Sequence, residues 1–171
     1  MKYNNTKEDF EIVRANAKEE FDVIRVLFRA YQKELGVDLT FQRFERELQQ
    51  LPKIYTESNG ALLLLNDLKD NKYVGCVGLK NLENGISEMK RLYVEPEYRD
   101  KKYGLQLALS IITVAIELGY KEMWLDTLEE LKPAINLYKK LGFSETAPYY
   151  DNPNEGVVYM RKKLDWNIPN L

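Results

Sequence analysis

The chain has 171 residues, 44% of them hydrophobic and 30% charged, with a formal net charge of −2, one cysteine and no histidine. This length favours one domain over residues 1–171, and the slightly acidic balance argues against a nucleic-acid partner. The missing histidine excludes Ser-His and Cys-His nucleophile pairs and most catalytic metal sites, so any general acid or base is Glu, Asp, Tyr, Lys, Cys, a terminus or water.

A lone cysteine, a polar N-terminus and the lack of a long apolar run predict a cytoplasmic protein with no metal and no membrane partner. Apolar residues recur at helical spacing in 18–35, which Gly36 ends, and in a shorter helix that Thr40 caps and Pro52 ends. The apolar runs after this helix pair are joined by short turns, which indicates an antiparallel meander. The expected strands of the first half are 10–15, 61–66, 73–79 and 88–94.

The second half of the chain alternates strand and helix, as in a parallel βαβα unit, and then closes with two strands around the turn-rich segment 148–156. The predicted fold class is α/β (α+β), with one mixed central sheet and helices on both faces. The expected elements are strand 88–94, helix 104–118, strand 122–127, helix 131–141 and the closing strands 143–146 and 157–164.

The segment from Glu88 to Gly104 passes from a strand through a basic loop directly into a helix. Free backbone N–H groups at the helix start, together with Arg99, Lys101 and Lys102, favour an anion such as a pyrophosphate. An ordinary solvated turn is the alternative. Neither G-x-x-x-x-G-K-[ST] nor G-x-G-x-x-G occurs, which argues against nucleoside-triphosphate and dinucleotide sites.

The run from Leu92 to Leu105 resembles motif A of the GCN5-related N-acetyltransferase (GNAT) family, whose loop has the form Q/R-x-x-G-x-G/A. Arg99 takes the first position of that loop and Gly104 the last. Lys102 stands where the family has its first glycine, so the backbone approach to the phosphates is either looser or replaced by the lysine ammonium.

A second segment, residues 134–143, looks like the family's A-x-x-L-Y-x-x-x-G-F helix, although Leu131 replaces an asparagine that commonly precedes it. With the meander and the helix pair ahead of the two motifs, the resemblance covers nearly the whole chain, and P-Y-Y-D-N-P at 148–153 resembles a stretch seen in an uncharacterised branch of the family. The resemblance implies the acyl-CoA N-acyltransferase (GNAT) fold, in which a mostly antiparallel sheet contains two parallel strands, here 88–94 and 122–127, that splay apart around the pantetheine arm.

The resemblance also implies the residues that hold acetyl-CoA, the expected co-substrate. Backbone groups of Leu92 and Val94 would hydrogen-bond the amides of the pantetheine arm, and the basic loop would hold the pyrophosphate. The implied cofactor-binding residues are Leu92, Tyr93, Val94, Arg99, Asp100, Lys101, Lys102, Tyr103, Gly104 and Leu105.

Two residues are the candidates for catalysis. Tyr138 matches the family tyrosine that protonates the departing thiolate, whereas its helical spacing alone is equally typical of core packing. Glu88 begins the strand that would line the splay and is the candidate base for the amine, either directly or through a water. The alternative is an edge carboxylate in solvent or paired with Lys90, and Asp126 and Asp151 are the other candidate bases.

The aromatic segment 148–153 combines tyrosines with one carboxylate, which suits a wall and a counter-charge for an amine. Tyr149, Tyr150 and Asp151 are therefore candidate acceptor-site residues, with a rigid proline turn as the alternative. Tyr31 and Glu34 lie at the end of the first long helix, where the family's helix pair borders the acceptor site. The alternative is that both are exposed to solvent, because a helix end needs polar residues anyway.

These inferences predict an acetyl-CoA-dependent N-acetyltransferase, in which a primary amine of a small molecule or peptide attacks the thioester directly in a ternary complex. A backbone N–H near Val94 would polarise the carbonyl. The alternative functions are a non-catalytic acyl-CoA-binding regulatory module and, less favoured by the acidic balance, an enzyme acting on charged tRNA. The acceptor and the oligomeric state stay open; homodimers are common in the family.

Overall fold

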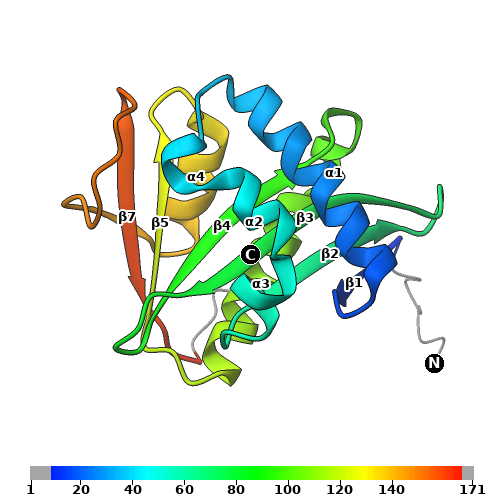
Figure 1. Cartoon of the computed structure of the whole chain (residues 1–171), viewed down its shortest axis with the longest axis horizontal. Coiled ribbons are helices and arrows are strands. Elements are labelled where there is room, and N and C mark those ends of the chain that lie inside the picture. The colour runs from blue at the N-terminus through cyan, green and yellow to red at the C-terminus, as the bar shows by residue number, and fades with distance from the viewer. Residues whose placement is uncertain (1–8, 167–171) are drawn as a thin grey trace, which may run out of the picture.

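The computed structural model describes residues 9–166, which form one seven-stranded sheet with helices on both faces (Figure 1). The strand order is β1-β2-β3-β4-β5-β7-β6, and every neighbouring pair is antiparallel except β4 and β5, which confirms the predicted mixed sheet. The strands are β1 (Phe10–Arg14), β2 (Ala61–Asp67), β3 (Lys72–Asn81), β4 (Ile86–Val94), β5 (Glu122–Leu128), β6 (Ser144–Thr146) and β7 (Val157–Lys163). The α-helices are α1 (Lys18–Leu35), α2 (Phe44–Gln49), α3 (Tyr103–Glu117) and α4 (Lys132–Lys140), and the shorter turns are η1 (Thr40–Gln42), η2 (Pro52–Thr56) and η3 (Pro96–Lys101).

Helices α1 and α2 cover one face of the sheet and α3 and α4 the other, each pair over its own core (Figure 1). On α1, Phe21, Ile24 and Phe28 lie three or four residues apart and are buried in the first core. On α3, Leu107 and Ile111 are fully buried in the second core. Burial of each such side chain stabilises the fold by about 1.5–3 kcal/mol, so both faces hold the sheet in place. None of the helices within residues 9–166 combines the length and apolar character needed to cross a bilayer.

Helix α1 has the predicted bounds, and local capping explains both ends. The Glu20 carboxylate accepts the backbone N–H groups of Asn16 and Ala17 before the first turn. Gly36 ends the helix in the left-handed region at φ 66°, and its N–H donates to the Gln32 carbonyl. The end of α1 is thereby fixed beside the sheet opening described below.

The second predicted helix is wrong in its bounds. The Asp38 carboxylate accepts the Thr40 N–H and hydroxyl, so Thr40 opens the three-residue turn η1 instead of capping a long helix. Arg43 then adopts φ 56°, which interrupts the helix and delays α2 to Phe44. Pro52 starts the π-helical turn η2, a position where its missing N–H costs nothing.

The parallel strands β4 and β5 pair only at their beginnings, where Ile86, Ser87 and Glu88 lie opposite Glu122, Met123 and Trp124. Beyond Glu88 they diverge, which confirms the predicted splay (Figure 1). The divergent part of β4 contains a bulge. Lys90 and Tyr93 pair with Gly78 and Cys76 of β3, so two β4 residues, Arg91 and Leu92, lie opposite the single β3 residue Val77. Arg91 has φ 59°. Bulges of this kind bend a strand and re-aim its side chains.

Lys102, at the position of the family glycine, has φ 60° and ψ 21°, the left-handed conformation that glycine adopts without steric strain. We expect Lys102→Gly to raise the free energy of unfolding by about 1 kcal/mol, measured by urea denaturation. Lys102→Ala removes the same side chain but retains the strained Cβ and is expected to give no gain. Equal stability of the two variants would show that the backbone at Lys102 is not strained.

Candidate active site

Three neighbouring cavities surround the divergence of β4 and β5. The helix cavity, about 300 Å³, lies between the end of α1, β4, the start of α3 and α4. The splay cavity, about 70 Å³, lies between the separated strands, and the loop cavity, about 800 Å³, lies between α2, η2 and segment 149–151. Leu92 and Ala134 line both the helix and splay cavities, and Gln42 and Lys90 line both the splay and loop cavities. The cavities therefore form a row through the sheet opening.

The helix cavity contains half of the residues expected to hold a cofactor: Leu92, Tyr93, Val94, Arg99 and Gly104. The Arg99 guanidinium donates through Nε to the Val94 carbonyl at 2.9 Å and pairs with the Glu34 carboxylate at 2.5 Å. It also lies 5.6 Å from the centre of the Tyr93 ring. Arg99 thus places a cation at this cavity, and an anion bound there would compete with Glu34 for it.

Two other expected cofactor residues point elsewhere. Lys101 Nζ and the Tyr103 hydroxyl both contact the buried Asp67 carboxylate of β2, each at 2.6 Å. These bonds hold the pKa of Asp67 well below its usual range, and burial together with the same carboxylate raises the pKa of Tyr103. Asp100 and Lys102 are exposed. Neither of them lines the helix cavity, and Lys101 does not line it either.

Leu105, the last of the expected cofactor residues, is half-buried and packs against the core beneath α3.

Tyr138 on α4 is buried and lines the splay cavity. Its ring meets Phe143 edge-on at 5.9 Å, but within residues 9–166 its hydroxyl has no hydrogen-bond partner. Burial raises the pKa of this hydroxyl, and the neighbouring Tyr31 and Asp126 raise it further, so it stays protonated. A protonated, unpaired hydroxyl in a cavity is a proton donor available to a bound group.

Glu88 is buried at the last position of β4 that pairs with β5, and it lines the loop cavity. The Tyr149 hydroxyl donates to its carboxylate at 2.6 Å, and Lys90 Nζ lies 3.4 Å from its other oxygen. The alternative of a solvent-exposed edge carboxylate is therefore wrong, whereas the contact with Lys90 is present. Burial and the carboxylate raise the pKa of Tyr149 far above its usual value, which keeps Tyr149 a donor and Glu88 an acceptor.

The aromatic segment closes the loop cavity beside Glu88. The Tyr149 ring contacts Trp124 at 5.0 Å and Tyr150 at 5.3 Å, and the Tyr150 hydroxyl donates to Asp126 at 2.8 Å. Asp151 is exposed and also lines this cavity. The structure therefore brings Tyr149, Tyr150 and Asp151 together, as expected for one wall.

Tyr31 is half-buried and lines the helix and splay cavities, not the loop cavity, with its ring centre 5.7 Å from the Arg91 guanidinium. Glu34 also lines the helix cavity, where it holds Arg99. Glu34 is exposed, as expected for a polar residue at a helix end, whereas Tyr31 is half-buried, and both line the helix cavity.

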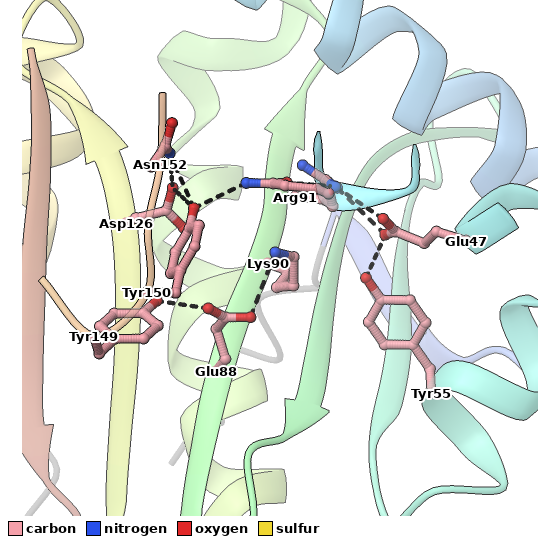
Figure 2. A network of polar contacts seen from close by, with 10 residues as sticks. Glu47, Tyr55, Glu88, Lys90, Arg91, Asp126, Tyr149, Tyr150 and Asn152 are labelled. Carbon is pink, nitrogen blue, oxygen red and sulfur yellow. Dashed lines mark hydrogen bonds and ion pairs between the residues drawn. The ribbon is translucent and has the colours of Figure 1, made fainter. Parts of the chain in front are cut away.

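Figure 2 shows a polar network that crosses the opening from segment 149–152 to η2. Gln42 donates to the Tyr150 hydroxyl at 2.9 Å and accepts from Arg91 at 2.9 Å. Arg91 pairs with the Glu47 carboxylate at 2.8 Å, and both side chains are almost fully buried. The Tyr55 hydroxyl also donates to Glu47, at 2.5 Å, so the bulge residue Arg91 is tied to both walls.

Sequence reasoning missed Arg91, Glu47, Gln42 and Trp124. The signal for Arg91 was a strongly charged residue in a strand expected to be buried, which requires a partner. Glu47 and Gln42 belong to a segment whose bounds were predicted wrongly, and neither has a local pattern that marks it. These four residues nevertheless line the cavities or hold the bulge that separates them.

Comparison with known proteins identifies the family and the fold. Residues 24–143 match the family described as the acetyltransferase (GNAT) family. An uncharacterised N-acetyltransferase of Schizosaccharomyces pombe is 42% identical over 147 residues, which are 85% of this chain and 90% of that protein. A GNAT-family acetyltransferase of Staphylococcus aureus has the same fold, with a TM-score of 0.76 at 22% identity, covering 91% of this chain and 99% of that one. An acetyltransferase of Salmonella typhimurium, solved with acetyl-CoA, gives a TM-score of 0.68 at 18% identity over 93% and 96% of the two chains.

Proposed function

Because the chain belongs to the acetyltransferase (GNAT) family, we propose that it transfers the acetyl group of acetyl-CoA to a primary amine of a small molecule or peptide. The observation that carries this proposal is the Tyr138 hydroxyl, which has no hydrogen-bond partner among residues 9–166 and lies in the splay cavity, midway along the row of three cavities. A thioester reaching the splay cavity from the helix side would meet an acceptor arriving from the loop side. Tyr138 would then lie at the reacting centre.

The helix cavity suits the pantetheine arm of acetyl-CoA. Its walls are apolar side chains of α1, α4 and β4, and Leu92, Tyr93 and Val94 follow the divergent part of β4, whose backbone there has no β5 partner. Arg99 and the start of α3 at Gly104 supply a cation and free N–H groups for the pyrophosphate. The Val94 carbonyl already accepts from Arg99, so a pantetheine amide would donate to the second lone pair of that oxygen.

The reaction is a direct transfer in a ternary complex. The bound co-substrate supplies an acetyl group activated as a thioester; the new C–N bond forms as the C–S bond breaks. A backbone N–H of β4 near Val94 would polarise the carbonyl, Glu88 would take the amine proton directly or through a water, and Tyr138 would give a proton to the leaving sulfur. Tyr149 and Lys90 hold the Glu88 carboxylate in place for that role.

The identity of the base is tested by two isosteric variants. We expect Glu88→Gln to lower kcat by about a hundredfold, because it removes the proton acceptor while keeping the shape of the loop cavity. Asp126→Asn, which removes the carboxylate bonded to Tyr150, is the matched control and is expected to change kcat less. The measurement is thiol release at saturating acetyl-CoA as a function of pH. A large loss in Asp126→Asn with none in Glu88→Gln would assign the base to Asp126.

The alternative function is a non-catalytic acyl-CoA-binding regulatory module, which the replacement of the loop glycine by Lys102 leaves open. The test is incubation with acetyl-CoA and an amine panel, followed by mass spectrometry of the products. An acetylated amine with stoichiometric free CoA supports the enzyme. Tight acetyl-CoA binding without any amide product would support the binding module.

The domain organisation, the compartment and the assembly of the chain are also part of the proposed function. We propose that residues 1–171 form one GNAT domain, because β1 and β7, outside the matched region, hydrogen-bond into the central sheet. A cytoplasmic site of action fits the buried, unpaired Cys76 and is tested by fractionation. A homodimer is the assembly we would look for first, by sedimentation.

A further inference from the structure

The loop cavity is lined by an excess of cationic side chains, although the chain as a whole has a net charge of −2. Arg43 lies between η1 and α2, Arg46 lies on α2 and Lys53 on η2, and none of them forms an ion pair with a carboxylate among residues 9–166. Arg46 contacts only the Gln50 amide oxygen, at 3.3 Å. This side of the cavity, the cationic wall, therefore offers three unpaired cations to a ligand.

The carboxylates of the same cavity do not cancel this charge. The charge of Glu47 is balanced by Arg91 and that of Glu88 by Lys90, although the Glu88 carboxylate, which accepts from Tyr149, keeps lone pairs that can accept from an amine. The other two carboxylates that line the cavity are Glu83 and Asp151, and they are outnumbered by four cations, the three of the cationic wall and Lys80. Lys80 lies opposite Glu88 in the register of β3 and β4. A polyamine in this cavity would lie beside uncompensated cations, which disfavours it.

The aromatic wall of the same cavity has a different character. Trp124, Tyr149 and Tyr150 present aromatic surface there, and the Glu88 carboxylate lies next to Tyr149, whose hydroxyl donates to it. Aromatic faces and a carboxylate favour a cationic or apolar group, while unpaired arginines favour an anionic one. The cavity is therefore complementary to a ligand that carries both an amine and an anionic group.

Arg43 gives a second, independent indication. Its backbone lies in the left-handed region, at φ 56° and ψ 42°, where residues other than glycine, asparagine and aspartate are rare. Strained backbone of this kind gathers at binding sites, where it aims a side chain. At Arg43 the strained turn joins η1 to α2 and places the side chain along the loop cavity.

We infer that the acceptor is a small amine that also carries a carboxylate, such as a free amino acid or a short peptide, and not a polyamine. Its amine lies against Glu88 and the aromatic wall, and its carboxylate against Arg43 and Arg46. This inference rests on the proposed function, since it names the acceptor of that same acetyl transfer.

The test compares paired ligands on the protein saturated with CoA. L-phenylalanine, L-leucine, L-methionine and the dipeptide Ala-Phe are each titrated beside the same amine without its carboxylate, and spermidine is titrated alone. We expect at least one carboxylated ligand to bind about tenfold or more tightly than its partner, and the dipeptide distinguishes free amino acids from peptides. Arg43→Gln and Arg46→Gln should each remove about tenfold of that preference, and Lys53→Gln on η2 gives a further variant if either fails to fold. Arg161→Gln, which removes an exposed arginine outside the three cavities, should leave the preference unchanged.

The outcomes separate this inference from the proposed function. Binding of CoA together with equal or tighter binding of the amines without a carboxylate, or of spermidine, overturns the inference and leaves acetyl transfer standing. Binding of CoA with no binding of any carboxylated ligand overturns it too. Failure of the protein to bind CoA overturns the proposed function, and the inference falls with it.

Discussion

Replacement of Tyr138 by phenylalanine is expected to lower kcat by about a hundredfold or more while leaving the affinity for acetyl-CoA unchanged. The hydroxyl lies in the splay cavity, stays protonated because burial raises its pKa, and has no partner among residues 9–166 whose loss would disturb the fold. The ring keeps its packing on Phe143 in the variant. The expected loss therefore falls on the chemical step, and not on folding or binding.

The measurement is steady-state thiol release combined with calorimetric titration of acetyl-CoA on the same preparation. Tyr159→Phe is a matched control, because its hydroxyl donates to the Tyr150 backbone carbonyl and does not line the splay cavity. A Tyr138→Phe enzyme with undiminished turnover would show that Tyr138 is a packing residue and that another group or water protonates the thiolate.

Replacement of Glu47 by glutamine is expected to lower the free energy of unfolding by about 3–5 kcal/mol, the largest effect on stability that we predict. Both partners of the Arg91–Glu47 pair are almost fully buried, so the variant leaves a buried guanidinium without its counter-charge. The control is Glu45→Gln, two residues before Glu47 in the sequence, which breaks an exposed ion pair with Arg29 and should lower the free energy of unfolding much less. The measurement is urea denaturation at neutral pH.

The same pair predicts a dependence on pH. Burial alone would raise the pKa of Glu47, but the charge and hydrogen bonds of Arg91 outweigh it and hold the pKa below its usual value. Its contribution to stability is thus complete above the unfolded pKa of about 4.3 and is lost as the pH falls through the lower, folded pKa. Replacing both residues by methionine should recover much of the loss and abolish this acid dependence. Equal acid sensitivity of the double variant and the natural protein would contradict this role of the pair.

The fold could be predicted from local patterns wherever one element decides its own structure. Helical spacing and Gly36 set the bounds of α1, and short turns between apolar runs set the β2–β3–β4 meander. The segment from Asp38 to Pro52 was predicted poorly because its turns depend on a side-chain bond from Asp38 and on the left-handed Arg43, neither of which gives a periodic signal. The splay of β4 and β5 was predicted from the family resemblance alone.

The candidate site was predictable where one motif contains it and not where distant segments meet. Tyr138 and Arg99 stand at motif positions, and both line cavities at the strand opening. The bond from Gln42 to Tyr150 joins residues 108 apart in the chain, and that from Arg91 to Glu47 joins residues 44 apart. Lys101 and Tyr103 lie within the motif but bind Asp67 of β2, a strand whose polar end gave no sign of this role.

The central claim is that the strand opening binds acetyl-CoA through the helix cavity, and calorimetric titration with acetyl-CoA tests it most directly. We expect saturable binding that Arg99→Ala weakens about tenfold or more, because a charge-assisted contact with the pyrophosphate is lost, while Arg161→Ala leaves it unchanged. No binding at millimolar acetyl-CoA, or equal affinity in the Arg99→Ala variant, would contradict this assignment of the cavity.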